Sequence, residues 1–448
     1  MRRRKTGWTQ LGSIVFTIIV FVILIAILFI GTPIGMGIGF LGVAGILLFL
    51  SPTLLKNMCM ITFNQATSVT TLMIPLFILM AEFLANSDMA GDLFEVINRR
   101  LKKLPANMAI ASVVTSALFS ALCGSAPATA VTIGRISIPT MLKMGYSPKL
   151  AGGTQAAGGN LGILIPPSIN FILYGVITET SVVDLFMAGV FPGIMLAGMM
   201  IAYILLRTKL DPAMITPPKE TSAETPEGGH SLSRDLITVV PMVALILIIF
   251  IVLYSGVATA TESAAIGVVG AIFAVFIQRR LTKSVFKKTL LQASSTTCMI
   301  LFLMFGGLVF ALFLTVQGLP QSLSAAILDA SPNPWITLIV VNIIFLVLGC
   351  FMEPLSIMLI VLPFTFPFLK MLGFDPVWLG VVLTINCAIG MITPPVGMNL
   401  FVLKGATGIK MSDLIRGVVP YLFIFAAGIV ILCFFPQIAL FLPGTMHG

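Results

Sequence analysis

Two short stretches decide the fold: GILIPPS at residues 162–168 and GMITPPVG at residues 390–397. They interrupt two apolar segments, 149–178 and 377–404, each long enough to cross a bilayer as a helix. Paired prolines lack two backbone N–H donors and cannot continue a helix. We therefore predict that both segments are broken helices, unwound near their middles.

The composition places these segments in a membrane. Of the 448 residues, 58% are hydrophobic and only 9% are charged, whereas a soluble domain carries roughly 25% charged residues. So few charges cannot cover a surface in water, which excludes a soluble enzyme, a nucleic-acid binder and a secreted disulfide scaffold. The six cysteines form no CxxC pair, and two histidines are too few for a histidine-based metal site or catalytic centre.

The remaining apolar segments predict an all-α polytopic membrane protein. Residues 107–143 and 335–370 each contain two short apolar limbs, divided by CGSAP at 123–127 and by GCFMEP at 349–354. We predict that each pair of limbs is a re-entrant helical hairpin, which enters the membrane and returns to its own side. Full spans are predicted near residues 13–30, 34–50, 66–85, 182–206, 236–254, 259–278, 292–314 and 415–441.

A fixed offset relates the two halves of the chain, which are separated by a polar linker at residues 209–235. Pro166 and Pro394 are 228 positions apart. The same offset relates Pro167 to Pro395, Gly162 to Gly390, Pro148 to Pro376, Gly145 to Gly373, Pro139 to Pro367, Gly42 to Gly270 and Gly39 to Gly267. Such ungapped matches indicate an internal duplication, with repeats at 1–208 and 236–448.

Counting membrane crossings predicts that the two repeats are inverted. Between equivalent points lie three spans, one hairpin that returns to its own side, one broken span and one further span. The number of crossings is odd, so the broken segments should meet near the midplane from opposite sides.

The distribution of charge agrees with this scheme. Neither 150–206 nor 289–369 contains a Lys or Arg. The basic loops and the linker fall together on the other side, which the positive-inside rule makes cytoplasmic. The basic tail at residues 2–5 favours the opposite side for the first helix, so the side of the N-terminus stays open. Residues 91–104 are amphipathic and predict a helix lying along the membrane surface.

The breaks predict an ion or substrate site. Unwound backbone at membrane depth leaves N–H and C=O groups that must be buried in protein or face a cavity. Carbonyls at half-helix C-termini suit a cation, and half-helix N-termini attract an anion. Neutral side-chain oxygens lie near these points at Ser125, Thr129, Ser168, Thr393 and Asn399.

Several motifs in order resemble one known family, the large membrane subunit of tripartite ATP-independent periplasmic (TRAP) transporters. The resemblance covers roughly residues 31–440. Its motifs are GSA at 124–126, IPTM at 138–141, AAGGNLG at 156–162, IPPS at 165–168, LFMAG at 185–189, ATESAA at 260–265, GCFME at 349–353 and TPPVGMNL at 393–400.

The resemblance implies a secondary transporter of the bacterial inner membrane, with Na⁺ as the coupling ion and no other cofactor. Its partners would be a small four-helix membrane subunit and a periplasmic binding protein. That protein would deliver an organic anion: a C4-dicarboxylate, a sialic acid, a sugar acid or a keto acid. The resemblance also implies an elevator mechanism, in which hairpins and broken helices slide as a transport domain against a scaffold of outer helices.

The candidate site residues follow from the breaks, the hairpin tips and this resemblance. Arg135 is a candidate contact for a substrate carboxylate, with a structural ion pair or an outward-reaching side chain as the alternatives. The other candidate substrate contacts are Ser168 and Asn399. The candidate Na⁺ ligands are Gly124, Ser125, Gly162, Pro166, Glu353, Gly390, Thr393, Pro394 and Gly397.

Three alternative functions are considered. A channel fits poorly, because two inverted hairpin-plus-break units favour alternating access to one site. A membrane-embedded enzyme lacks an HExxH motif, a GxSxG motif or paired intramembrane aspartates. A self-sufficient Na⁺/dicarboxylate symporter of related fold remains open.

The inverted arrangement predicts opposite labelling of two loops. In an otherwise cysteine-free protein, a cysteine at Ser331 should react with an impermeant maleimide from the periplasm, and one at Lys219 only from the cytoplasm. Intact cells and inverted vesicles provide the two measurements. Labelling of both positions from the same side would reject the inverted repeats.

Overall fold

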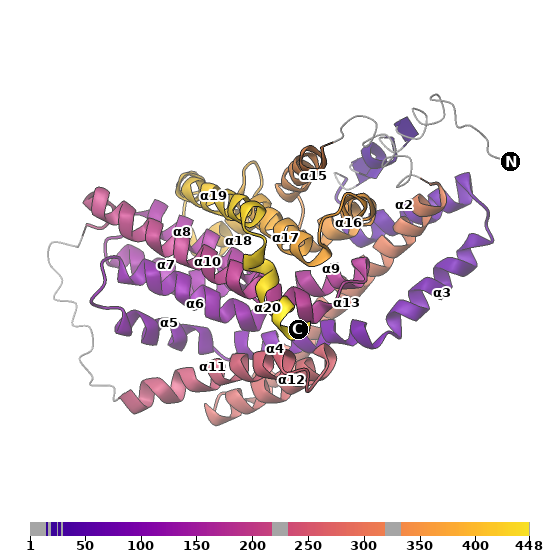
Figure 1. The fold of residues 1–448 in the computed structure, drawn as a ribbon. Helices are drawn as coiled ribbons and strands as arrows, with labels where there is room; N and C mark the ends of the chain where they lie inside the picture. The colour runs from indigo at the N-terminus through magenta and orange to yellow at the C-terminus, as the bar shows by residue number, and fades with distance from the viewer. Residues whose placement is uncertain are drawn as a thin grey trace.

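The computed structural model describes residues 15–16, 19–24, 26–27, 30–216, 232–318 and 333–447. Within these ranges the regular structure is helical, apart from one antiparallel β-bridge between Tyr146 and Ile215 (Figure 1). The all-α prediction is therefore confirmed for this part of the chain. Residues 2–5, Lys219, Ser331 and parts of the predicted segments 13–30 and 209–235 lie outside the described residues.

The helices alternate between long spans and short limbs. The first half contains α2 (Ile34–Phe49), α3 (Leu54–Ala66), η1 (Val69–Leu72), α4 (Met73–Ala85), α5 (Met89–Arg100), α6 (Asn107–Cys123), α7 (Ala126–Lys143), α8 (Pro148–Asn160), η2 (Leu161–Ile163), α9 (Ile169–Thr178), α10 (Val182–Leu210) and η3 (Pro212–Met214). The second half contains α11 (Leu232–Tyr254), α12 (Ala260–Ile277), α13 (Lys283–Val316), α15 (Pro334–Gly349), α16 (Pro354–Met371), α17 (Pro376–Ile392), α18 (Met398–Thr407), α19 (Met411–Phe434) and α20 (Gln437–His447).

Several of these helices have the length and composition of membrane spans. Among the described residues, five are long and apolar enough to cross a bilayer: α10, α12, α13, α16 and α19. The bent pair made by α3 with η1 and α4 would be a sixth. The chain is thus a multi-span helical protein, as its composition predicts.

The predicted span 66–85 instead belongs to a longer, bent unit. Helix α3 begins at Leu54, and the chain bends by 56° between Leu54–Ala66 and Val69–Ala85. The hydroxyl of Thr71 donates to the Gln65 carbonyl (2.8 Å) and accepts from the Gln65 amide (2.9 Å), so this pair bridges the bend. The offset of 228 maps this unit onto α13, which is one continuous helix of 34 residues.

The predicted span 415–441 is wrong in its second part. Helix α19 ends at Phe434, and a separate helix, α20, begins at Gln437. Pro436 lies between them; it has no N–H to donate and disfavours helical backbone in the residue before it. Apolar composition continues through this point, but the helix does not.

The predicted limbs and breaks all appear as separate helices. Helices α6 and α7 form one pair joined at Gly124, and α15 and α16 form another joined at residues 350–353. The predicted broken helices are α8 with α9 and α17 with α18. Helices α7 and α16 begin 228 positions apart, as do α8 and α17. The orientation of the repeats across a membrane stays a prediction.

Local chemistry fixes where the broken helices begin. Ser147 and Asp375 are N-caps, whose side chains accept from the backbone N–H groups of Leu150 and of Val377 and Trp378, respectively. Each cap is followed by a proline, Pro148 or Pro376, which is favourable at the first helical position.

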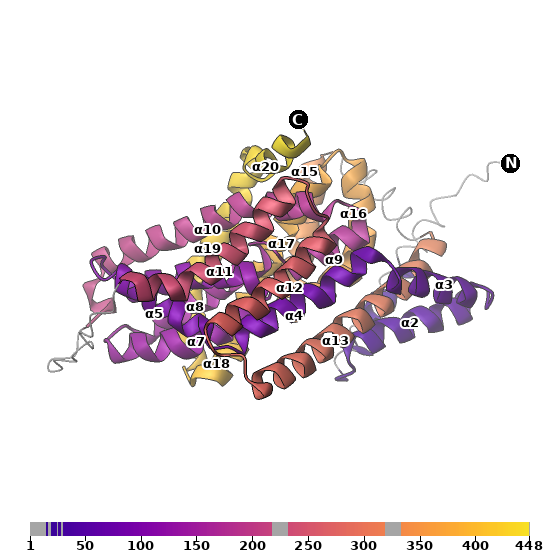
Figure 2. The same ribbon diagram turned by 90° about the horizontal axis from the view of Figure 1, so that it is seen from below.

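The two halves of the chain interleave. Figures 1 and 2 show α2 beside α13 at one end of the molecule, and α8, α10 and α19 together towards the other. Helix α2 packs on α13 through glycine: a Cβ at Gly42 would lie 2.8 Å from the Phe310 nitrogen. Helices α8 and α19 approach in the same way at Gly153 and Gly417. The two broken helices also touch each other, since α17 contacts both α8 and α9, so the breaks lie in a common interior.

Helix α5 confirms that the amphipathic segment predicted at 91–104 is largely helical, with slightly earlier bounds. Its place along the membrane surface stays a prediction. Arg280, which follows α12, donates to the Ser87 carbonyl (2.8 Å) and pairs with Asp92 of α5. Partial burial raises the pKa of the Asp92 carboxyl, although the Arg280 guanidinium opposes that shift. The start of α5 is therefore tied to the end of α12.

Candidate functional site

The tip of the first hairpin is fitted to the first break. Gly124 ends α6 with φ +61°, and a Cβ there would lie 2.8 Å from the Pro167 carbonyl oxygen. A Cβ at Gly162 would lie 2.8 Å from the Ser125 carbonyl oxygen. Only glycine allows this approach at either position. Gly124, Ser125, Gly162 and the proline pair beginning at Pro166 are therefore brought together, as the sequence predicts.

The tip of the second hairpin meets the second break in the same manner. A Cβ at Gly390 would lie 2.6 Å from the Gly349 Cα. The Gly397 N–H donates to the Cys350 carbonyl at 3.1 Å. The hydroxyl of Thr393, at the end of α17, donates to the Ile389 carbonyl at 2.6 Å. The second set of candidate residues thus contains a tip and a break held by backbone contacts.

Buried amide side chains join the two breaks to each other. Asn160, fully buried at the end of α8, donates to the Ala388 carbonyl (2.5 Å) and accepts a hydrogen bond from Asn399. Asn170 of α9 donates to the Thr384 hydroxyl of α17 at 2.8 Å. Ala388 is the position that the offset of 228 pairs with Asn160, so the link runs between equivalent points. Sequence reasoning missed Asn160 as a site residue; an amide inside an apolar broken helix was the available signal.

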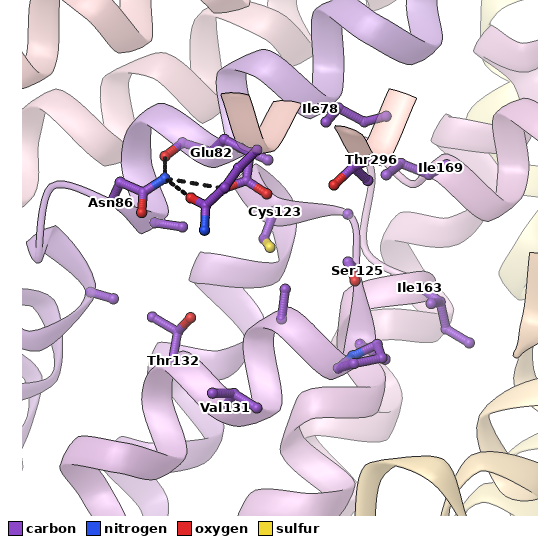
Figure 3. Close-up of a pocket in the computed structure, with 18 of the residues that line it drawn as sticks. Ile78, Glu82, Asn86, Cys123, Ser125, Val131, Thr132, Ile163, Ile169 and Thr296 are labelled. Carbon is purple, nitrogen blue, oxygen red and sulfur yellow. Dashed lines mark hydrogen bonds between the residues drawn. The ribbon is translucent and has the colours of Figure 1, made fainter. Parts of the chain in front are cut away.

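A cavity of about 740 Å³ lies against both hairpin tips. Figure 3 shows its wall at the first tip, with Cys123 and Ser125. Its walls include residues of α4, α7 and α13, so it lies between the hairpin tips and part of the α4–α13 pair. The candidate residues that line it are Gly124, Ser125, Arg135 and Glu353. The candidates that do not line it are Gly162, Pro166, Ser168, Gly390, Thr393, Pro394, Gly397 and Asn399.

Ser168 and Asn399 lie behind the cavity wall. The Ser168 hydroxyl donates to the Ile163 carbonyl (2.6 Å) and caps the N-terminus of α9. The Asn399 amide is used by the link to Asn160. Their polar groups therefore stabilise the breaks in this conformation.

Arg135 faces the cavity from α7. It is exposed and, within the described residues, makes no ion pair or side-chain hydrogen bond. The structural ion pair considered from the sequence is therefore absent from this part of the chain. Lys288 of α13 also lines the cavity. The cavity is also lined by the carboxylates of Glu82, Asp88 and Glu353, so its charged lining is mixed.

The opposite wall carries a polar cluster around Glu82, at the end of α4. The side-chain amide of Asn86 donates to the Glu82 carboxylate (3.1 Å) and to the Gln292 side-chain oxygen (2.7 Å), as Figure 3 shows. Thr296 lies nearby on α13. This cluster holds the end of α4 against α13.

The donor set at the tips suits a hard cation. Among the described residues, no group of three His, Cys, Asp or Glu could hold a metal ion. The oxygens present are carbonyls, hydroxyls and amides, which ions such as Na⁺ and Ca²⁺ prefer. The buried side-chain oxygens Oγ of Ser120, Oγ1 of Thr129 and Oδ1 of Asn399 have no hydrogen-bond partner within the part of the chain that the structure describes.

Comparison with known proteins assigns the chain to a family. The family described as the DctM component of the tripartite ATP-independent periplasmic transporter matches residues 21–438. The chain belongs to this family. The resemblance noted in the sequence motifs is thereby confirmed. As a DctM-family member, the chain is the permease component of a bacterial membrane transporter and not an enzyme.

Individual relatives match over more than nine tenths of this chain. The C4-dicarboxylate TRAP transporter large permease protein DctM of Pseudomonas aeruginosa is 38% identical over 91% of this chain and 94% of its own. The sialic acid TRAP transporter large permease protein SiaM of Vibrio cholerae is 31% identical over 95% and 97%. The isethionate TRAP transporter permease protein DctMQ of Oleidesulfovibrio alaskensis is 31% identical over 93% of this chain but only 65% of its own length.

A solved structure supports the fold alone. The YdaH transporter of Alcanivorax borkumensis superimposes with a TM-score of 0.62, covering 85% of this chain and 86% of that one, at 14% sequence identity. The DctM-family chain therefore shares its arrangement of helices with a second transporter of very different sequence.

The amide link between the breaks predicts a stability defect. Asn160→Ala leaves the Ala388 carbonyl and the Asn399 amide buried without their partner, and should lower the free energy of unfolding by about 1–3 kcal/mol. Denaturant unfolding of the purified chain in detergent measures this. Asn64→Ala, at an exposed position on α3, is the control and should be neutral. Equal stability of the two variants would contradict the role given to Asn160.

Proposed function

We propose that this chain is the transporting subunit of a Na⁺-driven system that imports an organic acid anion across the bacterial cytoplasmic membrane. The observation that carries the proposal is the pair of hairpin tips, each fitted by glycine contacts to a broken helix, around one shared cavity. Relatives are named for C4-dicarboxylates, sialic acid and 2,3-diketo-L-gulonate. The substrate belongs to this group: a C4-dicarboxylate, a sialic acid, a sugar acid or a keto acid.

The coupling ion binds where the tips meet the breaks. One Na⁺ site comprises Gly124, Ser125, Gly162 and Pro166, and the second comprises Glu353, Gly390, Thr393, Pro394 and Gly397. Support comes from the approach of the Ser125 and Pro167 carbonyls to the glycines of the first site, and from the place of Glu353 at the start of α16. Bound Na⁺ contributes positive charge at each site, and its binding involves no redox step in the protein.

The substrate binds in the cavity beside these ion sites. Arg135 is the proposed contact for its carboxylate, because it lines the cavity and is not engaged by another described residue. Ser168 and Asn399 lie behind the cavity wall, where their hydrogen bonds hold the backbone of the two breaks. A volume of about 740 Å³ suits a small organic acid with its bound water.

Transport follows an elevator mechanism between two inverted repeats. The hairpins and broken helices form the moving body, and the outer helices, including α4 and α13, form the scaffold. Two features support this division: the cavity lies along that boundary, and each tip is interlocked with its own break and cannot easily move without it.

Capture of the substrate is assigned to a periplasmic binding protein, with a small four-helix subunit beside this chain in the membrane. Support comes from the tripartite nature of the family and from the isethionate relative, whose name joins M and Q and whose length exceeds the match. Apolar side chains such as Phe40, Leu48 and Phe63 are more than half exposed on α2 and α3, where a membrane partner or lipid would cover them.

Substitutions at the proposed ion sites should weaken the Na⁺ dependence of uptake selectively. Ser125→Ala and Thr393→Ala each remove one hydroxyl ligand, which should raise the half-saturating Na⁺ concentration for uptake roughly 5- to 10-fold. Gly162→Val and Gly390→Val should impair Na⁺ activation more than folding, because they separate tip from break. Ser255→Ala, at an exposed position after α11, is the control. Unchanged Na⁺ activation in all four variants at normal expression would remove these segments from the ion sites.

If a binding protein must deliver the substrate, proteoliposomes without that protein should show no uptake. Vesicles containing this chain and its small subunit should show negligible uptake of a C4-dicarboxylate, sialic acid or keto acid under an inward Na⁺ gradient. Uptake should begin when the liganded binding protein is added outside. Robust uptake by this chain alone would favour the self-sufficient symporter instead.

A further inference from the structure

A second hollow lies apart from the hairpin tips, where α8 begins and α10 ends. Its volume is about 410 Å³, and three cations line it: Lys149 of α8, Arg207 of α10 and Arg416 of α19. Tyr203 and Tyr421 contribute aromatic surface, with ring centroids 5.1 Å apart. The hollow shares no lining residue with the cavity at the hairpin tips.

Close packing of backbones builds this hollow. A Cβ at Gly417 would lie 2.1 Å from the Lys149 carbonyl oxygen, so α8 and α19 are in direct contact there. The segment after α10 closes one side: the Ser147 N–H donates to the Met214 carbonyl (2.8 Å), and the Thr216 N–H donates to the Gly145 carbonyl (2.9 Å). The hollow is therefore a formed feature of the fold and does not depend on flexible side chains alone.

The charge of the hollow is positive and only partly balanced. Arg207 pairs with Asp211 at 3.2 Å. Lys149 and Arg416 are exposed and make no ion pair with any residue that the structure describes. Two cations thus border a concave surface with no carboxylate paired to either.

The position of the hollow corresponds to the headgroup region of a bilayer. Helices α10 and α19 both have the length and composition of membrane spans, and Arg207 lies in the last turn of α10. Beside the hollow, Leu206 and Leu210 of α10 are 58% and 70% exposed, and Phe423 of α19 is 71% exposed. Cations next to exposed apolar side chains at a span end match an amphiphile with an anionic head.

The three cations have no basic counterparts at the offset of 228. The offset of 228 maps Lys149, Arg207 and Arg416 onto Val377, Phe435 and Ala188, all apolar. Gly417 and Pro420 correspond to Gly189 and Pro192, but Gly189 packs on the Leu164 carbonyl of the first break. The positive-inside rule explains basic residues near a span end. It does not explain why three of them border one hollow.

We propose that this hollow binds the phosphodiester headgroup of an anionic phospholipid, with Lys149 and Arg416 as its charge partners and the acyl chains lying along the exposed faces of α10 and α19. Basic pockets between spanning helices hold such headgroups in other membrane proteins. The exposed apolar rim favours a lipid over free phosphate. This site is independent of the substrate and ion sites proposed above.

Native mass spectrometry of the full chain in detergent tests the proposal, with phosphatidylglycerol, phosphatidylethanolamine and inorganic phosphate as separate probes. The wild type should bind phosphatidylglycerol in preference to phosphatidylethanolamine. Lys149→Ala with Arg416→Ala should weaken phosphatidylglycerol binding about 30-fold, or about 5-fold for each cation removed. Lys143→Ala with Lys209→Ala removes the same charge from exposed residues outside the hollow and should leave binding unchanged.

Three results would overturn the proposal. The first is equal phosphatidylglycerol binding by the two double variants. The second is displacement of phosphatidylglycerol by an equal concentration of inorganic phosphate, which would make the hollow a free-anion site. The third concerns the exchange Lys149→Arg with Arg416→Lys, which keeps both charges. This double variant should retain the preference for phosphatidylglycerol even if the alanine variant is unstable. A loss of that preference at normal thermal stability would count against the headgroup site.

Discussion

Backbone groups that the two proline pairs leave without helical partners must be satisfied inside the protein, and this need organises its centre. Carbonyls and N–H groups at membrane depth cannot turn to lipid. Here Gly124 and Gly162 bring the first hairpin tip onto the first break, and Gly349 and Gly390 do so in the second half. Asn160 then joins one break to the other through the Ala388 carbonyl. The hairpins, the breaks and the cavity beside them depend on these contacts.

The same contacts link structure to the proposed transport cycle. A tip that is interlocked with its break through glycine cannot shift alone, since the atoms already lie at contact distance. A cation bound to carbonyls from both parts would tighten that contact, and an anion in the cavity would meet Arg135 on the same body. In the proposed cycle, one set of backbone contacts would couple ion binding, substrate binding and rigid movement.

The two halves of the chain differ in several elements that the offset of 228 aligns. The bent unit of α3 and α4 corresponds to the single continuous helix α13, and the basic hollow corresponds to apolar positions. The helix starts at Pro148 and Pro376 remain equivalent. The break glycines Gly162 and Gly390 are equivalent in the two halves. The tip glycines are not, because Gly124 corresponds to Met352 and Gly349 to Ala121. Outer helices and surface charges have diverged as well.

The sequence by itself determined the features that depend on consecutive residues. Proline pairs cannot continue a helix, and N-caps followed by proline start one, so the hairpins and breaks were predictable within a few residues. The tertiary structure alone decided which candidates face the cavity: Arg135 does, whereas Ser168 and Asn399 lie behind its wall. It also decided the partner of Asn160, which is 228 residues away. Such contacts depend on how helices from distant parts of the chain pack together, and local sequence chemistry does not encode that packing.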